Sequence, residues 1–207
     1  SCNYYFNTVG YWLGFNGGEE SEDGVGIERL MKYAALFGLD DNSGIEIAES
    51  DPQMADVAVA PAAMGQSNNA YTTTQLAKYV ATIANRGTCY DLTLLDKITD
   101  TSGTVLREQT PNIHSQISLS ADAWGAIQYG MNQVIHNTAS IEGTDAIEWA
   151  GKTGTAPISN IDLEDNIWFC LVAPKDDPEI AVVIFVPNGL SDCKVYDTAK
   201  AIITYYF

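Results

Sequence analysis

Positive charge is scarce in this sequence, whose 207 residues include ten Lys and Arg against 27 Asp and Glu, a formal net charge of −17. Such a chain would repel phosphate backbones, so nucleic acid is a poor partner. We interpret most of the carboxylates as a solubilising acidic surface. The Gly- and acid-rich stretch 14–26 is accordingly predicted to be a solvated loop.

Long hydrophobic runs are missing as well. No apolar run reaches the length needed to span a bilayer, and no basic segment followed by an apolar one marks a signal peptide. The sequence begins at Ser1 without an initiator methionine, which favours a piece of a longer protein. At this length we expect one large domain or a small pair, long enough for a substantial core.

Metal-ligating residues are few and scattered. The four cysteines form no Cys-x-x-Cys pair: Cys2, Cys89, Cys170 and Cys193. Neither a zinc site nor a disulfide framework is indicated, and His114 and His136 match no ligand spacing. Cys170 lies inside the apolar run 167–173, where we predict a buried free thiol.

Helical periodicity is present along much of the chain. Apolar residues at helical spacing predict helices over 27–37 and 73–85, a third after Ser120 and a closing helix over 191–207. The inward positions expected for the closing helix are Val195, Ala199, Ile202 and Tyr206. Residues 58–69, rich in small side chains, are interpreted as a loop.

Strand signals are concentrated near the end of the sequence. The runs 167–173 and 180–186 are apolar on both alternate faces, which predicts strands with helices covering both faces of their sheet. The polar loop 175–179 between them makes the pair antiparallel. Two shorter strands are expected over 93–99 and 104–107. The pattern is that of an α+β fold, with a mostly helical part over 1–147 and sheet strands with a closing helix over 148–207.

Just before the two apolar strands lies the stretch Glu148-Trp149-Ala150-Gly151-Lys152-Thr153-Gly154-Thr155. On an exposed strand edge it would place an ammonium, two hydroxyls and free backbone N–H groups along one line. Gly154 has no side chain to block the approach of another backbone or a ligand. Such an edge could hold a carboxylate and an oxyanion together, as acyl transfer requires. The alternative is a surface lysine followed by a tight turn.

Together with the antiparallel apolar hairpin and the closing helix, this stretch resembles the penicillin-binding transpeptidase domain, the serine acyltransferase fold shared with serine β-lactamases. That family carries Ser-x-x-Lys, Ser-x-Asn and Lys-Thr-Gly motifs. Lys152-Thr153-Gly154 matches the third motif and Ser1-Cys2-Asn3 the second, with a rival at Ser67-Asn68-Asn69. Class B proteins of the elongation type have similar segments: Phe37-Gly38-Leu39, Gly44-Ile45-Glu46, Thr74-Gln75-Leu76-Ala77 and Ala84-Asn85-Arg86-Gly87.

The first motif departs from the family order. Ser-x-x-Lys should precede Ser-x-Asn, but the sequence has this spacing only at Ser191-Asp192-Cys193-Lys194, after the Lys-Thr-Gly stretch. We interpret Ser191 as the N-cap of the closing helix. The resemblance therefore implies that the nucleophilic serine, the first strands of the sheet and a membrane anchor lie upstream of this chain.

The resemblance also implies roles for individual residues. Ser1 would relay a proton between the lysine of the nucleophile and the leaving group, and Asn3 would hold the amide of the substrate. Lys152 would keep the site positive and hydrogen-bond to Ser1. The hydroxyls of Thr153 and Thr155 would bind the substrate or penicillin carboxylate, with Gly154 between them, and the N–H of Thr155 would form half of an oxyanion hole.

The function implied is that of the C-terminal part of a peptidoglycan D,D-transpeptidase, extracytoplasmic and membrane-anchored through its missing part. It would cross-link D-Ala-D-Ala stem peptides, be inhibited by β-lactams and need no cofactor. This segment should not contact the membrane, and alone it should be inactive. Its apolar sheet should pair with the upstream part of the domain or with a second copy. The alternatives are a penicillin sensor or degenerate wall-binding module without turnover and, third, a serine β-lactamase.

Overall fold

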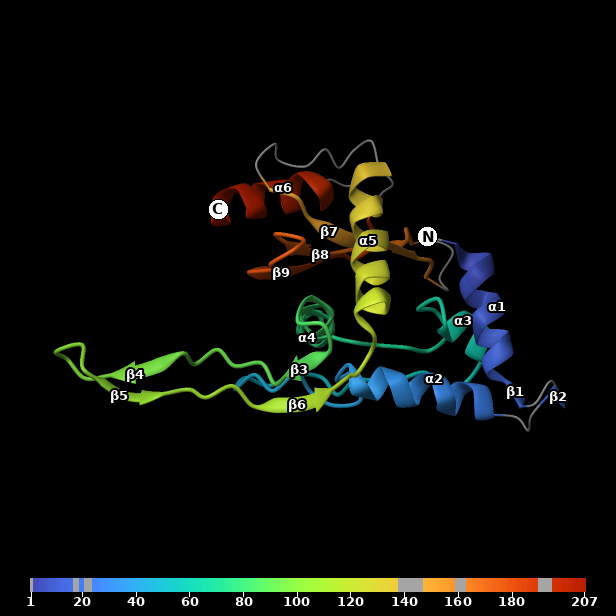
Figure 1. Cartoon of the computed structure of the whole chain (residues 1–207), viewed down its shortest axis with the longest axis horizontal. Coiled ribbons are helices and arrows are strands. Elements are labelled where there is room, and N and C mark those ends of the chain that lie inside the picture. Colours follow the sequence, from blue (N-terminus) through green and yellow to red (C-terminus); the bar gives the residue numbers. More distant parts are fainter. Residues whose placement is uncertain (1, 17–18, 21–23, 138–146, 159–162, 190–194) are drawn as a thin grey trace. The chain divides into compact units, whose positions relative to one another are not determined.

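A computed structural model describes residues 2–16, 19–20, 24–137, 147–158, 163–189 and 195–207 (Figure 1). The chain divides into two compact units. One contains residues 2–82 and 87–117, and the other contains residues 83–86 and the described residues from 118 to 207. The first unit combines helices with short strand pairs and irregular segments, and the second carries the three-stranded sheet.

The helices of the first unit are α1 (Asn3–Leu13), α2 (Val25–Leu36), α3 (Val59–Ala62) and α4 (Thr73–Ala84), whose last two residues belong to the second unit. Helices α1 and α3 cross closely at Gly10, where an added Cβ would lie 2.8 Å from the Ala60 Cα. Only glycine permits this approach. The sequence pattern predicted α2 and α4 but not α1, and its loop over 58–69 contains α3.

The apolar face of α2 forms the core of this unit. Ile27 is buried with Ala55 and Ala62, and Leu30 and Met31 pack against them. The helical spacing of Ile27, Leu30 and Met31 predicted this stripe correctly.

Helix α4 starts where the sequence predicted, because the Thr72 hydroxyl accepts a hydrogen bond from the Gln75 N–H at 3.1 Å. Its buried face is less apolar than expected. Val80 and Ile83, two of the apolar residues of the predicted helix, are buried, but so are Gln75 and Lys78. These polar side chains have partners within the unit, so their burial is compatible with a stable fold.

Two strand pairs complete the first unit. Strand β3 (Thr88–Tyr90) pairs antiparallel with β6 (Ile113–Gln116), and β4 (Lys97–Thr99) with β5 (Val105–Glu108). The β4–β5 hairpin extends away from β3 and β6 as a narrow arm (Figure 1). The sequence predicted this hairpin but missed β3 and β6. A further short pair, β1 (Phe15–Asn16) with β2 (Glu19–Glu20), lies within the stretch expected to be a solvated loop.

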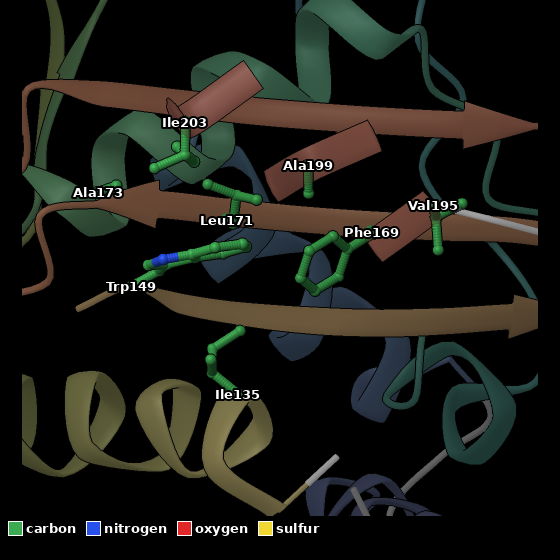
Figure 2. Packing of buried hydrophobic residues seen from close by; sticks show 8 residues of the cluster. All are labelled: Ile135, Trp149, Phe169, Leu171, Ala173, Val195, Ala199 and Ile203. Carbon is green, nitrogen blue, oxygen red and sulfur yellow. The ribbon is translucent and has the colours of Figure 1, made fainter. Parts of the chain in front are cut away.

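The second unit is built on an antiparallel sheet in the order β7-β8-β9: Ala150–Ala156, Asn166–Ala173 and Ile180–Val186. One face packs against α6 (Val195–Tyr206), with Phe169, Leu171 and Ala173 directed towards that helix (Figure 2). The antiparallel hairpin of β8 and β9 confirms the sequence prediction.

Helix α5 (Ala121–Asn137) begins after Ser120, whose hydroxyl accepts a hydrogen bond from the Ala123 N–H at 3.2 Å. This is the predicted N-cap. In α6 the predicted inward stripe was partly wrong. Val195 and Ala199 are buried, but Ile203 completes the stripe, and Tyr206 is half exposed. The prediction placed Ile202 in the stripe instead of Ile203. Because each residue turns a helix by about 100°, this error directs the second half of the expected stripe away from the core.

Candidate active site

The Lys-Thr-Gly-Thr stretch forms the middle of β7, as the sequence predicted. Strand β7 pairs with β8 from Ala150, opposite Val172, to Ala156, opposite Asn166. Among the described strands β7 has a partner on one side only, so its other edge carries backbone groups outside the ladder. A ligand of extended shape can bind along such an edge.

The start of β7 is anchored firmly. Trp149 is 1% exposed and packs with Leu171 and Ile135 of α5 (Figure 2). The side-chain amide of Asn132 on α5 donates a hydrogen bond to the Trp149 carbonyl at 2.8 Å. Burial then decreases along the strand, and Lys152 is its first exposed residue.

Gly154 lies opposite Trp168, and the two approach closely. A Cβ on Gly154 would lie 3.2 Å from the Trp168 Cβ. The indole stacks on Phe185 of β9 with ring centroids 4.1 Å apart. Because Gly154 has no side chain, the stacked Trp168 and Phe185 can pack close to β7.

Lys152 projects from the exposed part of β7. Its ammonium donates a hydrogen bond to the Thr153 carbonyl at 2.5 Å. Partial burial lowers the pKa of Lys152, and the neighbouring Cys170 acts in the opposite direction. The lysine is thus a cation in a partly desolvated position, suited to bind an anion.

The two threonines alternate with Lys152 along the strand. Successive side chains of a strand point to opposite faces, so Thr153 and Thr155 share one face while Lys152 and Gly154 share the other. Thr155 is exposed and Thr153 partly exposed. The strand thus offers one ammonium and two hydroxyls over four consecutive residues. Because Lys152 and the threonines lie on opposite faces, a carboxylate can contact both kinds of group only at the edge of the strand that is unpaired among the described strands, where edge N–H groups can stabilise an oxyanion.

The other residues assigned by resemblance belong to other segments of the chain. Asn3 is the first residue of α1 in the other unit and is exposed, and Ser1 lies outside the described residues. The rival Ser67-Asn68-Asn69 makes contacts within its own loop. Ser67 donates to the Val57 carbonyl at 2.7 Å, and Asn69 accepts from the Ala55 N–H at 2.8 Å.

The Ser191-x-x-Lys194 spacing also lies outside the described residues, as does Cys193. Of the remaining cysteines, Cys170 carries a free thiol as predicted, but it is only partly buried. No group of three or more His, Cys, Asp or Glu within the described residues could hold a metal ion. None of the described helices is both long and apolar enough to cross a membrane.

Two residues beside Lys152 were not singled out for the site from the sequence. Cys170 lies directly opposite Lys152, and Trp168 lies opposite Gly154. Both were recognised as part of an apolar strand, but their register relative to β7 depends on how the connection over 157–165 closes. The alternation of side chains along β8 indicates which face each one occupies, but it does not indicate which residue of β7 lies opposite.

Solved structures of transpeptidases share this fold. Penicillin-binding protein 2B from Streptococcus pneumoniae (strain R6) superposes with a TM-score of 0.82 and 25% identity, covering 99% of this chain and 37% of that chain. Penicillin-binding protein A from M. tuberculosis, solved as an imipenem acyl-enzyme complex, gives a TM-score of 0.81 at 20% identity, covering 99% and 45%. The mixed α+β architecture predicted from the sequence is confirmed.

The model of the penicillin binding protein transpeptidase domain matches residues 1–203, and this chain belongs to that family. The curated penicillin-binding protein 2B of the same Streptococcus strain is 27% identical over 181 residues. The peptidoglycan D,D-transpeptidase MrdA of Haemophilus influenzae is 26% identical over 243 residues. The alignments cover 79% and all of this chain, but the chain spans only 26% and 35% of those two relatives.

Proposed function

We propose that this chain is the C-terminal part of the transpeptidase domain of a class B, elongation-type penicillin-binding protein. The parent protein cross-links peptidoglycan by acylating a serine with D-Ala-D-Ala stem peptides, without a cofactor. The observation that carries the proposal is the Lys152-Thr153-Gly154-Thr155 stretch on β7, which pairs with another described strand on one side only.

The stretch supports specific roles for its residues. The ammonium of Lys152 attracts the substrate carboxylate, and the hydroxyls of Thr153 and Thr155 orient it by charge-assisted hydrogen bonds. The N–H of Thr155 forms half of the oxyanion hole, since an edge strand can direct backbone donors at a developing negative charge. Gly154 leaves room for the substrate backbone.

In this proposal Ser1 is the proton relay, and Asn3 is the group that binds the substrate amide. The nucleophilic serine belongs to a Ser-x-x-Lys segment preceding Ser1. Two findings support this: the family order of the motifs, and the limited share of each relative that the chain spans. The parent protein is extracytoplasmic and anchored through another segment. The preceding part of the domain, or a second copy of this chain, pairs with the sheet.

β-Lactams are the natural probe of this function, because penicillin-binding protein A of M. tuberculosis forms an acyl-enzyme with imipenem. We expect the parent protein to be labelled by a fluorescent penicillin on a serine upstream of this chain, and the isolated chain not to be labelled. Mass-spectrometric mapping of the label to Ser191 or Ser1 would overturn the assignment.

Lys152→Ala in the parent protein tests the site directly. Loss of one charge-assisted contact costs about 1.5–3 kcal/mol, which slows acylation about ten- to a hundredfold. The folded fraction, followed by circular dichroism, should stay unchanged. A variant that loses folded protein but is acylated normally while folded would make Lys152 structural. Two outcomes for the unmodified parent protein would favour the alternatives. Fast hydrolysis of its acyl-enzyme would favour a β-lactamase, and acylation without transpeptidation would favour a sensor.

A further inference from the structure

Lys152 has an uncharged partner directly across the ladder. The β7–β8 register places Cys170 opposite Lys152, and the β8–β9 register places Val183 opposite Cys170. Directly opposed residues of an antiparallel pair share one face of the sheet, with their Cβ atoms about 5 Å apart. The nearest cross-strand neighbour of the lysine is therefore a thiol.

The next positions on this face are also uncharged. Their residues are Ala150 and Gly154 on β7, and Val172 and Trp168 opposite them on β8. Glu148 is the acidic residue that precedes β7 in the sequence, and its carboxylate is already paired with Lys175 at 2.5 Å. The lysine is thus surrounded on its sheet face by groups that cannot form an ion pair.

The lysines of the described residues differ in their acidic neighbours. Three lie within 4 Å of a carboxylate: Lys78, Lys97 and Lys175. Lys32 and Lys200, both on exposed parts of helices, are in no such pair with a described residue. Lys152 has no carboxylate of a described residue within that distance, and its ammonium is held by the neutral Thr153 carbonyl.

The physical consequence concerns competition for the ammonium. A carboxylate opposite Lys152 would form an internal ion pair, and opposite charges attract more strongly at a protein surface than in bulk water. A ligand carboxylate would then have to displace it. Burial raises the pKa of Cys170 to about 11, so its thiol is neutral near pH 7. Within the described residues, Cys170 is the titratable group that acts on Lys152.

We propose that Cys170 is a positioning residue, whose neutral side chain opposite Lys152 keeps the lysine free of an internal ion pair and available to the carboxylate of the ligand. The proposal rests on the role of Lys152 proposed above. It concerns a residue outside the three sequence motifs. Cys170 itself touches neither the ligand nor the reacting atoms.

The matched pair Cys170→Asp and Cys170→Asn in the parent protein tests it, since the two side chains have nearly the same shape and differ in charge. We expect Cys170→Asp to be acylated by a fluorescent penicillin at least about tenfold more slowly than Cys170→Asn at pH 7.5. The alkaline limb of its pH–rate profile should also move to higher pH, because a neighbouring carboxylate raises the pKa of a lysine. Cys170→Val should keep the wild-type rate within about threefold.

Equal rates and identical pH profiles for Cys170→Asp and Cys170→Asn would overturn the proposal and leave Cys170 a packing residue. If that pair fails to fold, the longer Glu and Gln variants replace it, because their polar ends reach beyond the sheet surface. Lys152→Ala in the same series separates the two proposals. Normal acylation of Lys152→Ala would reject the proposed role of Lys152. Slow acylation of Lys152→Ala without a difference between the charged and neutral Cys170 variants would reject only the role of Cys170.

Discussion

Lys78 and Lys152 occupy opposite environments in the two units. The side chain of Lys78 is fully buried in α4, and its ammonium lies 2.7 Å from the Asp91 Oδ1 atom. Lys152 on β7 is exposed, with only partial shielding from water, and it bonds to a neutral carbonyl. Burying a charge is costly unless it has a partner, whereas an exposed cation needs none. The comparison distinguishes a lysine that serves the fold from one whose charge is available to a ligand.

Lys78→Met should have the largest effect on stability, because it leaves Asp91 beside a buried site without its cation. We expect a loss of about 3 kcal/mol in the free energy of unfolding. Urea unfolding followed by circular dichroism measures it. Lys152→Met is the matched control and should change stability by less than about 0.5 kcal/mol. Similar losses for the two variants would remove the distinction.

Asn132→Leu should have an intermediate effect. It removes the hydrogen bond to the buried Trp149 carbonyl at the start of β7 and leaves that acceptor unsatisfied. The expected loss is about 1–2 kcal/mol, again from urea unfolding. Asn137→Leu on the same helix is the control, since Asn137 is exposed and bonds only to Gln133 at 3.3 Å among described residues. If the two variants are equally stable, β7 does not depend on this anchor.

Acid should weaken the ion pair of Lys78 and Asp91, and the loss of stability should be gradual as the pH falls. Burial raises the pKa of Asp91, but hydrogen bonds from Lys78 and Asn112 and the charges of Lys78 and His114 outweigh it and hold the pKa below its ordinary value. Because the folded-state pKa is lowered, the stabilisation is present above the unfolded value near pH 4. It is lost as the pH falls through the folded-state pKa, with a slope of at most about 1.4 kcal/mol per pH unit.

Urea unfolding of the wild type and Asp91→Asn between pH 5 and pH 2 measures this slope. The wild type should lose more stability than the variant over the interval. Parallel curves would show that Asp91 does not titrate differently in the folded and unfolded states, and that Lys78 is stabilised by other contacts.

The sequence predicted the elements whose pattern is local. The stripe of α2, the caps at Thr72 and Ser120 and the apolar hairpin of β8 and β9 follow from neighbours within a few positions. Helix α1 was missed because its aromatic residues are largely exposed, among them Tyr4, Tyr5 and Trp12. An exposed aromatic surface has no helical stripe to detect.

The candidate site was predicted in part for the same reason. Lys152-Thr153-Gly154-Thr155 is contiguous in sequence, so a strand prediction sufficed to place it. The burial of Lys78 was missed because its partner Asp91 is thirteen positions away. The pairing of Lys152 with Cys170 depends on a register across a nine-residue connection, which local patterns do not determine.

The order β7-β8-β9 has a consequence for how this chain tolerates change. The three strands follow one another in the sequence, joined by connections of nine and six residues. Closing loops this short carries little entropic cost, and contacts between near neighbours in sequence form quickly. Insertions or deletions outside residues 150–186 alter neither connection. The alignment of Lys152 with its cross-strand neighbours is therefore insulated from length variation in the rest of the chain.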